Sequence, residues 1–503
     1  MTIPPSKAFW IHRVATTAWV KSRKATAGRW RRRRRACLLN EKRNPRNLPR
    51  RRRHDKDQLS LFLPHDLLLQ TVRPFAPAAT FTDAQTPLAE PSYVTYVMQP
   101  MCRLIGNKRA LIDFIEDTVW HVRGLCDSHR LGTLPSKITI LDAFAGSTVV
   151  SRMLAAHATK LYSNDFENYA HIFGQCYLEH PEKKGVSLEH VKALALAANA
   201  AADDSVLEMK KLSGEGNKQV KVGIMATHYA PADSDSIKEG ERCFFTHENA
   251  VRIDAIRHFI AEKCSEAETP YLLAPLLVQC SIRANTTGVF NAFMKKDGIG
   301  CWGGRTETSG DRKRIIDALV IPEVEFNPHK GCDVKCFKED ANKLIPNKIQ
   351  ISEPELDLIY VDSPYNQHSY GSNYGVLNIV ADNRMPKKVT ANSGIPVDWQ
   401  RSAYYKKNEA AIAMKDLLKK ATLKAKYVLI SFSDEGHIDS DGWDEILQPY
   451  WSEAFQKDHR STMGTRNYEK RGKSTVVEVL YLVWAKNKGL PGPRQAGECL
   501  APC

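Results

Sequence analysis

The residues best suited to hold an amino group are Asp362, Ser363, Pro364 and Tyr365, which follow an apolar run at 356–361. An open α/β sheet binds its ligands beyond the carboxyl ends of such strands. Pro364 restricts Ser363 to an extended backbone and so fixes the direction of the Ser363 carbonyl. This carbonyl and the Asp362 carboxylate provide two hydrogen-bond acceptors beside an aromatic ring, the combination that an exocyclic amine on a flipped base requires.

A second group of residues is suited to hold a nucleoside. The loop 142–147 contains Gly146, whose lack of a Cβ lets a ligand lie against the backbone. The next apolar run ends in Asp165, about twenty positions after the loop, where a carboxylate can accept the hydroxyl hydrogens of a ribose. Because the GxGxxG pattern that would bind a pyrophosphate is absent, we expect a nucleoside without phosphates.

Short apolar runs alternate with amphipathic segments from Tyr93 onward. The runs lie at 137–142, 160–165, 356–362, 427–432 and 474–484. Such alternation predicts an α/β fold with a doubly wound sheet.

The sheet is expected to form from two parts of the chain, 91–175 and 351–488. The region 176–350 between them combines Ala-rich helix with Gly-containing loops and a basic cluster at 312–314. We expect it to be a mostly helical inserted domain.

Positive charge is concentrated at one end of the chain. The 503 residues carry a formal net charge of +15, and residues 1–90 hold 20 Lys and Arg against 6 Asp and Glu, a net of +14. The global charge therefore does not indicate what the rest of the chain binds. Like charges at 31–35 and 50–53 repel each other, so we expect a disordered basic tail, either merely solvated or a salt-sensitive phosphate anchor. Residues 489–503 are expected to form a flexible C-terminal tail.

The basic tail contains a short motif made of Gln58, Leu59, Ser60, Leu61 and Phe62. It resembles the peptide by which bacterial DNA enzymes bind the replication sliding clamp. A clamp partner is a hypothesis that rests on this motif alone.

Several other classes of protein are disfavoured by the composition. Apolar stretches fall short of the roughly 18 residues of a membrane helix, so no membrane span is expected. The 12 cysteines are scattered without a Cys-x-x-Cys pair, which favours a reducing compartment, and we expect a cytoplasmic protein. His329, Cys332 and Cys336 lack a second ligand pair at zinc spacing, so no metal site is predicted.

Residues 93–485 resemble the adenine-specific DNA methyltransferases of the Dam-like class, which use S-adenosylmethionine (AdoMet) and have an Asp-Pro-Pro-Tyr catalytic motif. The resemblance rests on Asp362–Tyr365, on the loop 142–147, and on 104–109, which is similar to the family's N-terminal IGSKR element. It implies a Rossmann-like methyltransferase sheet with an inserted target-recognition domain. It also implies transfer of the AdoMet methyl group to the N6 amine of adenine in double-stranded DNA.

The resemblance implies three groups of site residues. The catalytic residues are Asp362, Ser363, Pro364 and Tyr365. The cofactor-binding residues are Lys108, Asp142, Phe144, Gly146, Asp165 and Asp340. Asn366 and Tyr370 are expected to contact DNA, and base contacts are expected from the inserted domain, with Arg283, Asn285, Lys295, Lys296, Arg305 and Arg312 as candidates.

The chain departs from the family pattern at three positions. Ser363 stands where the family has its first proline, but the backbone carbonyl of that position is retained. Thr148 replaces the second glycine of the AdoMet loop, and it either crowds the methionine end of AdoMet or caps the following helix. His368 replaces an arginine, which changes a phosphate contact or the target sequence.

Two other functions stay open at the level of sequence. The same pocket could methylate the N4 amine of cytosine, although the first residue of the tetrapeptide is more often Asp in adenine enzymes and Ser in cytosine enzymes. The chain could also be a DNA-binding protein that has kept a methyltransferase scaffold without turnover. A cognate restriction endonuclease as partner is a further hypothesis, and the sequence does not give the DNA target.

Overall fold

The computed structural model describes residues 72–73, 91–99, 101–102, 104–127, 135–214, 223–303, 309–347, 356–459 and 476–493. All of them belong to one unit of the chain, His65–Cys503. The predicted clamp-binding motif at 58–62 and the candidate Arg305 lie outside the described residues. So do most of the basic tail at 1–90 and the C-terminal tail beyond 493.

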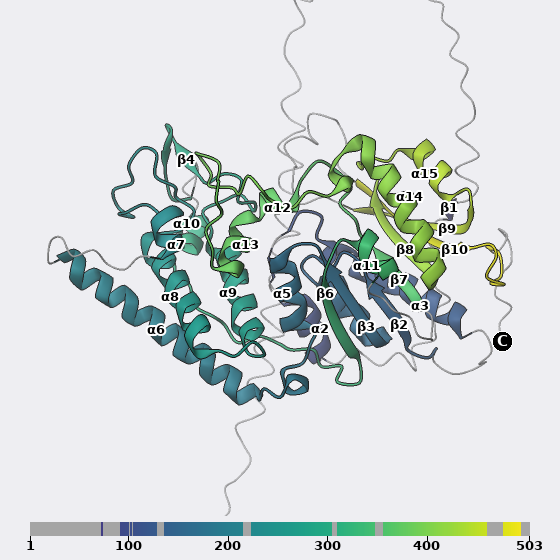
Figure 1. Ribbon diagram of the computed structural model, residues 1–503, viewed down its shortest axis with the longest axis horizontal. Helices are drawn as coiled ribbons and strands as arrows, with labels where there is room; N and C mark the ends of the chain where they lie inside the picture. Colours follow the sequence, from purple (N-terminus) through teal and green to yellow (C-terminus); the bar gives the residue numbers. More distant parts are fainter. Residues whose placement is uncertain are drawn as a thin grey trace, which may run out of the picture. The chain divides into compact units, whose positions relative to one another are not determined.

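Eight of the described strands form a mixed sheet in the order β1-β9-β10-β8-β7-β2-β3-β6 (Figure 1). Strands β6, β3, β2, β7 and β8 run parallel, whereas β10 is antiparallel to both β8 and β9. The predicted α/β fold is confirmed, and the sheet is mostly parallel. The strands are β1 (Val72–Arg73), β2 (Ile138–Asp142), β3 (Ala158–Asp165), β6 (Asp333–Lys338), β7 (Leu356–Val361), β8 (Ala425–Ser433), β9 (Tyr450–His459) and β10 (Val476–Ala485).

The parallel strands have a winding order that creates a ligand site. Numbered along the chain, they lie in the order 3-2-1-4-5, so the direction of winding reverses between β2 and β7. Connections therefore leave β2 and β7 toward opposite faces, and a crevice opens between them at their carboxyl ends.

Two hydrophobic clusters, one on each face of the sheet, explain why the central strands are apolar on both faces. Leu358 of β7 packs on one face with α2, α3 and α4, and Ile359 packs on the other with α11, α14 and α15. These helices are α2 (Pro91–Met98), α3 (Ile112–Cys126), α4 (Val149–His157), α11 (Ala341–Asn347), α14 (Lys407–Lys424) and α15 (Ser440–Leu447).

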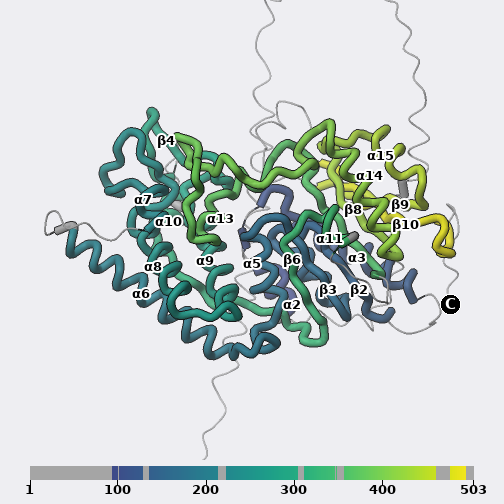
Figure 2. Tube along the Cα trace, viewed as in Figure 1, coloured from purple at the N-terminus to yellow at the C-terminus, as the bar shows by residue number. Residues whose placement is uncertain are grey.

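A further group of helices, which we call the helical lobe, lies beside the sheet (Figures 1 and 2). These helices surround a third hydrophobic cluster. Helix α5 (Asn168–Tyr177) connects this lobe to the sheet, because it packs against both β6 and α9. The lobe consists of α6 (Leu188–Gly214), α7 (Ile224–His228), α8 (His247–Lys263), α9 (Thr269–Arg283), α10 (Ser309–Ile316), α13 (Gly375–Asp382) and the hairpin of β4 (Lys295–Lys296) and β5 (Ile299–Gly300). The remaining short elements are α12 (Tyr370–Asn373), η1 (Lys108–Leu111), η2 (Pro181–Lys184) and η3 (Ala403–Tyr405).

Two features of the structure correct the predicted domain boundaries. Strand β6 lies within 176–350, which the sequence pattern assigned to the insertion, yet it pairs with β3 from Asp333 to Lys338. This strand alternates charged and less polar residues, so it lacks the apolar run by which the other parallel strands were found. Conversely, α13 lies within 351–488 but packs in the core of the helical lobe.

Candidate active site

The reversal of winding brings three segments of the chain together. The loop after β2 lies beside the end of β7, where Ala143 N donates to Tyr360 O at 3.0 Å. The same loop contacts the end of β3, because Ala145 N donates to Asn164 O at 2.8 Å. The predicted nucleoside loop, the predicted ribose acid and the predicted catalytic tetrapeptide therefore meet at one edge of the sheet.

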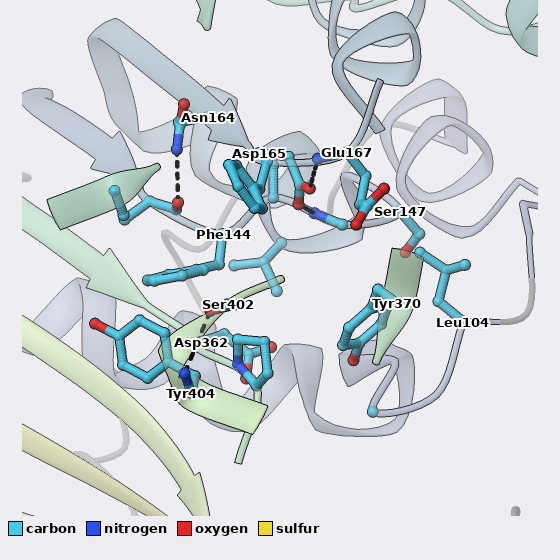
Figure 3. Close-up of a pocket in the computed structure, with 18 of the residues that line it drawn as sticks. Leu104, Phe144, Ser147, Asn164, Asp165, Glu167, Asp362, Tyr370, Ser402 and Tyr404 are labelled. Atoms are coloured by element: carbon cyan, nitrogen blue, oxygen red, sulfur yellow. Dashed lines mark hydrogen bonds between the residues drawn. The ribbon is translucent and has the colours of Figure 1, made fainter. Parts of the chain in front are cut away.

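These segments line one continuous cavity, whose empty space of about 910 Å³ includes solvent at its open mouth. Figure 3 shows Phe144, Asp165 and Asp362 around it. The predicted site residues on its wall are Lys108, Phe144, Gly146, Asp165, Asp340, Asp362, Pro364 and Tyr370. The sequence prediction missed several other wall residues, among them Glu167, Tyr404 and Tyr405.

The backbone of the loop after β2 has a positive φ at two positions, Gly146 and Thr148. Gly146 has φ of +52° and its N–H donates to Asp165 Oδ2 at 2.7 Å. Thr148 has φ of +63°, a conformation that glycine adopts without strain and a β-branched residue rarely does. Thr148 makes no side-chain cap on α4, and its hydroxyl donates to Ser147 O instead. Of the two alternatives stated for Thr148, a side-chain cap on the helix is therefore wrong.

Asp142 lies beneath the loop and not on the cavity wall. Its Oδ2 accepts from Ser151 Oγ at 2.5 Å, and its Oδ1 accepts from Phe144 N at 3.3 Å. Burial raises the pKa of this carboxyl to about 7, against the effect of the two hydrogen bonds. Asp142 was predicted as a cofactor ligand, but its contacts make it a support for the loop.

Two acidic residues, Asp165 and Glu167, lie at the end of β3 and just after it. Asp165 accepts from Gly146 N on one oxygen and from Glu167 N, at 2.9 Å, on the other. Glu167 Oε2 accepts from Asn378 Nδ2 at 2.7 Å, whereas the buried Oε1 has no hydrogen-bond partner in the described structure. Burial raises the pKa of Glu167 to about 7. An unpartnered carboxylate oxygen on a cavity wall indicates a place for a ligand donor.

The segment before η1 closes one side of the cavity. Tyr370 donates its hydroxyl to Ile105 O at 2.5 Å, and Ile105 N donates to the Tyr374 hydroxyl at 2.8 Å. Asn107 Nδ2 donates to Ser147 Oγ at 3.1 Å, which ties this segment to the loop after β2. Tyr370 was predicted to contact DNA, but its position is on the cavity wall with its hydroxyl engaged.

Lys108 is buried between two carboxylates. Its Nζ lies 2.9 Å from Asp362 Oδ1 and 3.0 Å from Glu478 Oε1. Burial raises the pKa of Asp362 to about 6, although Lys108 opposes this shift. Burial also acts to raise the pKa of Glu478, but Lys108, His459 and Ser431 outweigh it and hold that pKa at about 2. The sequence prediction contained Lys108 and Asp362 but not Glu478.

The remaining members of the predicted tetrapeptide lie beside the cavity. Ser363 is buried, and Tyr365 packs edge-on against Phe432 with 6.0 Å between ring centroids. Lys108 Nζ lies 5.4 Å from the centre of the Tyr365 ring. The next residue, Asn366, accepts from His368 N at 3.0 Å and so shapes the turn that follows.

The candidate base-contacting residues of the lobe fall into two groups. Asn285 is fully buried and donates to Cys243 O and Cys301 O, so it is structural, and the prediction of a base contact is wrong for it. Arg283 donates to Arg314 O and lies 3.4 Å from Asp317. Lys295 and Lys296 are exposed on the β4–β5 hairpin, where Lys295 Nζ lies 4.8 Å from the centre of the Phe293 ring, and Arg312 is exposed on α10.

The described residues contain no cluster of three or more His, Cys, Asp or Glu side chains that could hold a metal ion. Within the same part of the chain, no helix combines the length and apolar character needed to cross a membrane.

The chain matches one family model and several individual proteins of known class. Residues 104–433 match a family model described as D12 class N6 adenine-specific DNA methyltransferase. The chain is 27% identical to modification methylase StsI of Streptococcus sanguinis, over 78% of this chain and 53% of the relative. It is 26% identical to type II methyltransferase M.NlaIII of Neisseria lactamica, over 75% of this chain and 98% of the relative. It is also 26% identical to type II methyltransferase M.CviAII of Paramecium bursaria Chlorella virus 1, over 71% of this chain and 91% of the relative. The chain thus spans about half the length of the first relative and nearly all of the other two.

The backbone of Thr148 gives a test of the loop geometry. We expect the Thr148→Gly variant to be more stable than Thr148→Ala by about 1 kcal/mol, because the left-handed conformation costs roughly 1–2 kcal/mol for an L-residue other than glycine. At a residue with ordinary φ, glycine would be the less stable of the two. Denaturant unfolding of both variants measures the difference. Equal stability, or a more stable Thr148→Ala, would show that residue 148 does not have this conformation.

Proposed function

The chain belongs to the D12 class N6 adenine-specific DNA methyltransferase family, and we propose that it transfers the methyl group of AdoMet to the N6 amine of adenine in double-stranded DNA. The family that the sequence resemblance indicated is thus confirmed. The observation that carries the proposal is that the cavity and the Asp362 carboxylate on its wall meet at the point where winding reverses.

The residues of the cavity fit AdoMet. Asp165, together with the unpartnered Oε1 of Glu167, offers acceptors for the ribose hydroxyls, and Asp340 offers one for the adenine amine. A Cβ on Gly146 would meet only Leu104 at 3.8 Å, so this backbone faces open space that a ligand can fill. When bound, AdoMet supplies a methyl group on a positively charged sulfur.

Asp362 and its neighbours can hold the target amine. Lys108 occupies Asp362 Oδ1, which leaves Oδ2 to accept one N–H of the flipped adenine, and the Ser363 carbonyl accepts the other. Tyr365 provides an aromatic face for stacking, worth about 1–3 kcal/mol. When the amine takes up the methyl group that bound AdoMet would supply, Asp362 would stabilise the positive charge on nitrogen and accept the proton that nitrogen then releases.

We propose that the helical lobe is the target-recognition region. Lys295, Lys296 and Arg312 are exposed on it, and such side chains contact guanine edges and phosphates. Two of these relatives carry names of type II methyltransferases and one that of a modification methylase, which supports a cognate restriction endonuclease as functional partner. Docking onto a sliding clamp and a cytoplasmic location stay predictions from the sequence.

The Asp362→Asn variant tests the catalytic assignment. We expect its rate of methyl transfer to DNA to fall by about 10²–10³-fold, the usual effect of removing one group that stabilises transition-state charge. Its affinity for AdoMet should persist. Asp357→Asn is the matched control, because Asp357 pairs with Lys426 at the other end of β7. Full activity of Asp362→Asn would rule out the proposed role.

The pH dependence of transfer gives an independent test. Asp362 must be ionised to accept the amine hydrogen, and burial raises its pKa to about 6. We therefore expect the single-turnover rate to be constant at alkaline pH and to fall about tenfold per unit below pH 6, as Asp362 becomes protonated. Rapid-quench measurement with saturating AdoMet gives this profile. A rate that stays constant down to pH 5 would contradict an ionised Asp362 as acceptor.

The two acids after β3 are expected to control cofactor affinity. Asp165→Asn and Glu167→Gln should each raise the Kd for AdoMet about tenfold, since a hydrogen bond to a charged group contributes roughly 1.5–3 kcal/mol. Calorimetric titration without DNA measures this directly. Glu182→Gln, which alters an exposed pair with Lys330, serves as the control. Unchanged affinity in both variants would place the ribose elsewhere.

A further inference from the structure

A buried carboxylate on β10 has no part in the function proposed above. Glu478 lies in the row of inward-facing β10 residues with Val476, Leu480 and Leu482, all of which are buried and apolar. It is 2% exposed and does not line the cavity. A charged side chain in such a row is costly unless it is paired, so its partners indicate what it does.

The partners of Glu478 lead directly to the site. Lys108 Nζ lies 3.0 Å from Glu478 Oε1 and 2.9 Å from Asp362 Oδ1, so a single ammonium is shared by the two carboxylates. Ser431 of β8 donates to Glu478 Oε1 at 2.6 Å. His459 of β9 lies 3.7 Å from Glu478 Oε2. Glu478 is thus held by Lys108 of η1 and Ser431 of β8, with His459 of β9 near its other oxygen, whereas Lys108 contacts Asp362 through Oδ1.

We propose that Glu478 is a positioning residue that acts through Lys108 to control how strongly Asp362 accepts a hydrogen bond from the target amine. The inference rests on the methyl transfer proposed above. If Lys108 were paired with Asp362 alone, its full positive charge would oppose positive charge on the nearby amine nitrogen. Because Glu478 takes a share of this cation, Asp362 keeps enough negative charge to serve as an acceptor.

The ionisable groups around Asp362 support this division of roles. The pKa of Glu478 is held at about 2. The pKa of Asp362 is raised to about 6 by burial and by the charge of Glu478, and Lys108 opposes this rise. Tyr360 and Tyr370 also face Asp362, and burial raises their pKa values well above the ordinary value, so they stay neutral. Burial raises the pKa of Asp142 on β2 to about 7, and the negative charge of Asp362 adds to this effect.

The effect of Glu478 is measured by the acid limb of the rate profile. We expect Glu478→Gln to move this limb to lower pH by about one unit, because Lys108 then pairs with Asp362 alone and favours its ionised form. The plateau rate should fall, since a weaker base is a weaker acceptor. Single-turnover methyl transfer to unmethylated genomic DNA between pH 5 and pH 9 gives both quantities for the full-length chain.

A second variant moves the limb in the opposite direction. Ser431→Ala removes the hydroxyl that stabilises the Glu478 carboxylate, so Glu478 draws more strongly on Lys108. Asp362 then loses stabilisation of its charge, and the acid limb should shift to higher pH. Glu478→Asp keeps a carboxylate on β10 and should bring the limb back toward its wild-type position. Glu453→Gln, on the neighbouring strand β9 and paired with His121, is the matched control.

The outcomes separate this inference from the proposed function. Opposite shifts in Glu478→Gln and Ser431→Ala, with AdoMet affinity retained, support the shared lysine. Active variants whose acid limbs coincide with that of the wild type overturn the role of Glu478. A Glu478→Gln variant that fails to fold leaves the shift in Ser431→Ala as the deciding result. Absence of methyl transfer by the wild type on its target would instead count against the proposed function.

Discussion

The parallel pairing of β2 with β7 is the constraint on which the site depends. Leu141 lies opposite Ile359 and Asp142 opposite Tyr360, so the two strands end together. The chain leaves these ends toward opposite faces of the sheet, so a crevice opens between the segments that follow. Segments far apart in the sequence are in this way brought to one cavity, and the family relationship agrees with the chemistry that they can perform.

Within this crevice the fold buries charge, which costs stability. Lys108 loses its hydration, and burial by itself would lower its pKa, but Asp362 and Glu478 raise that pKa well above the ordinary value. A well-packed apolar substitute for such a cluster is often equally or more stable, so the cluster is better explained by the site than by folding. The left-handed backbone of Thr148 is a further local strain at the same edge.

The sequence was sufficient for features that depend on local pattern. Apolar runs indicated β2, β3, β7, β8 and β10, and motif order placed Asp362 and Asp165 in one site. Strands β6 and β9 were not found because both carry many polar residues, as strands near the edges of a sheet do. Glu478 was missed because nothing in a β10 sequence shows that its partner is Lys108. Glu167 could have been suspected from its spacing to Asp165, but its unpartnered oxygen is visible only in three dimensions.

The most direct test of the central claim is the identity of the methylated nucleoside. The full-length protein is incubated with methyl-labelled AdoMet and unmethylated genomic DNA, which is then digested to nucleosides and separated. Methyl transfer at the Asp362 pocket predicts label in N6-methyladenine. Label in N4-methylcytosine would assign the amine pocket to the other base. Binding of AdoMet without any label in DNA from several genomes of different base composition would contradict the transfer itself.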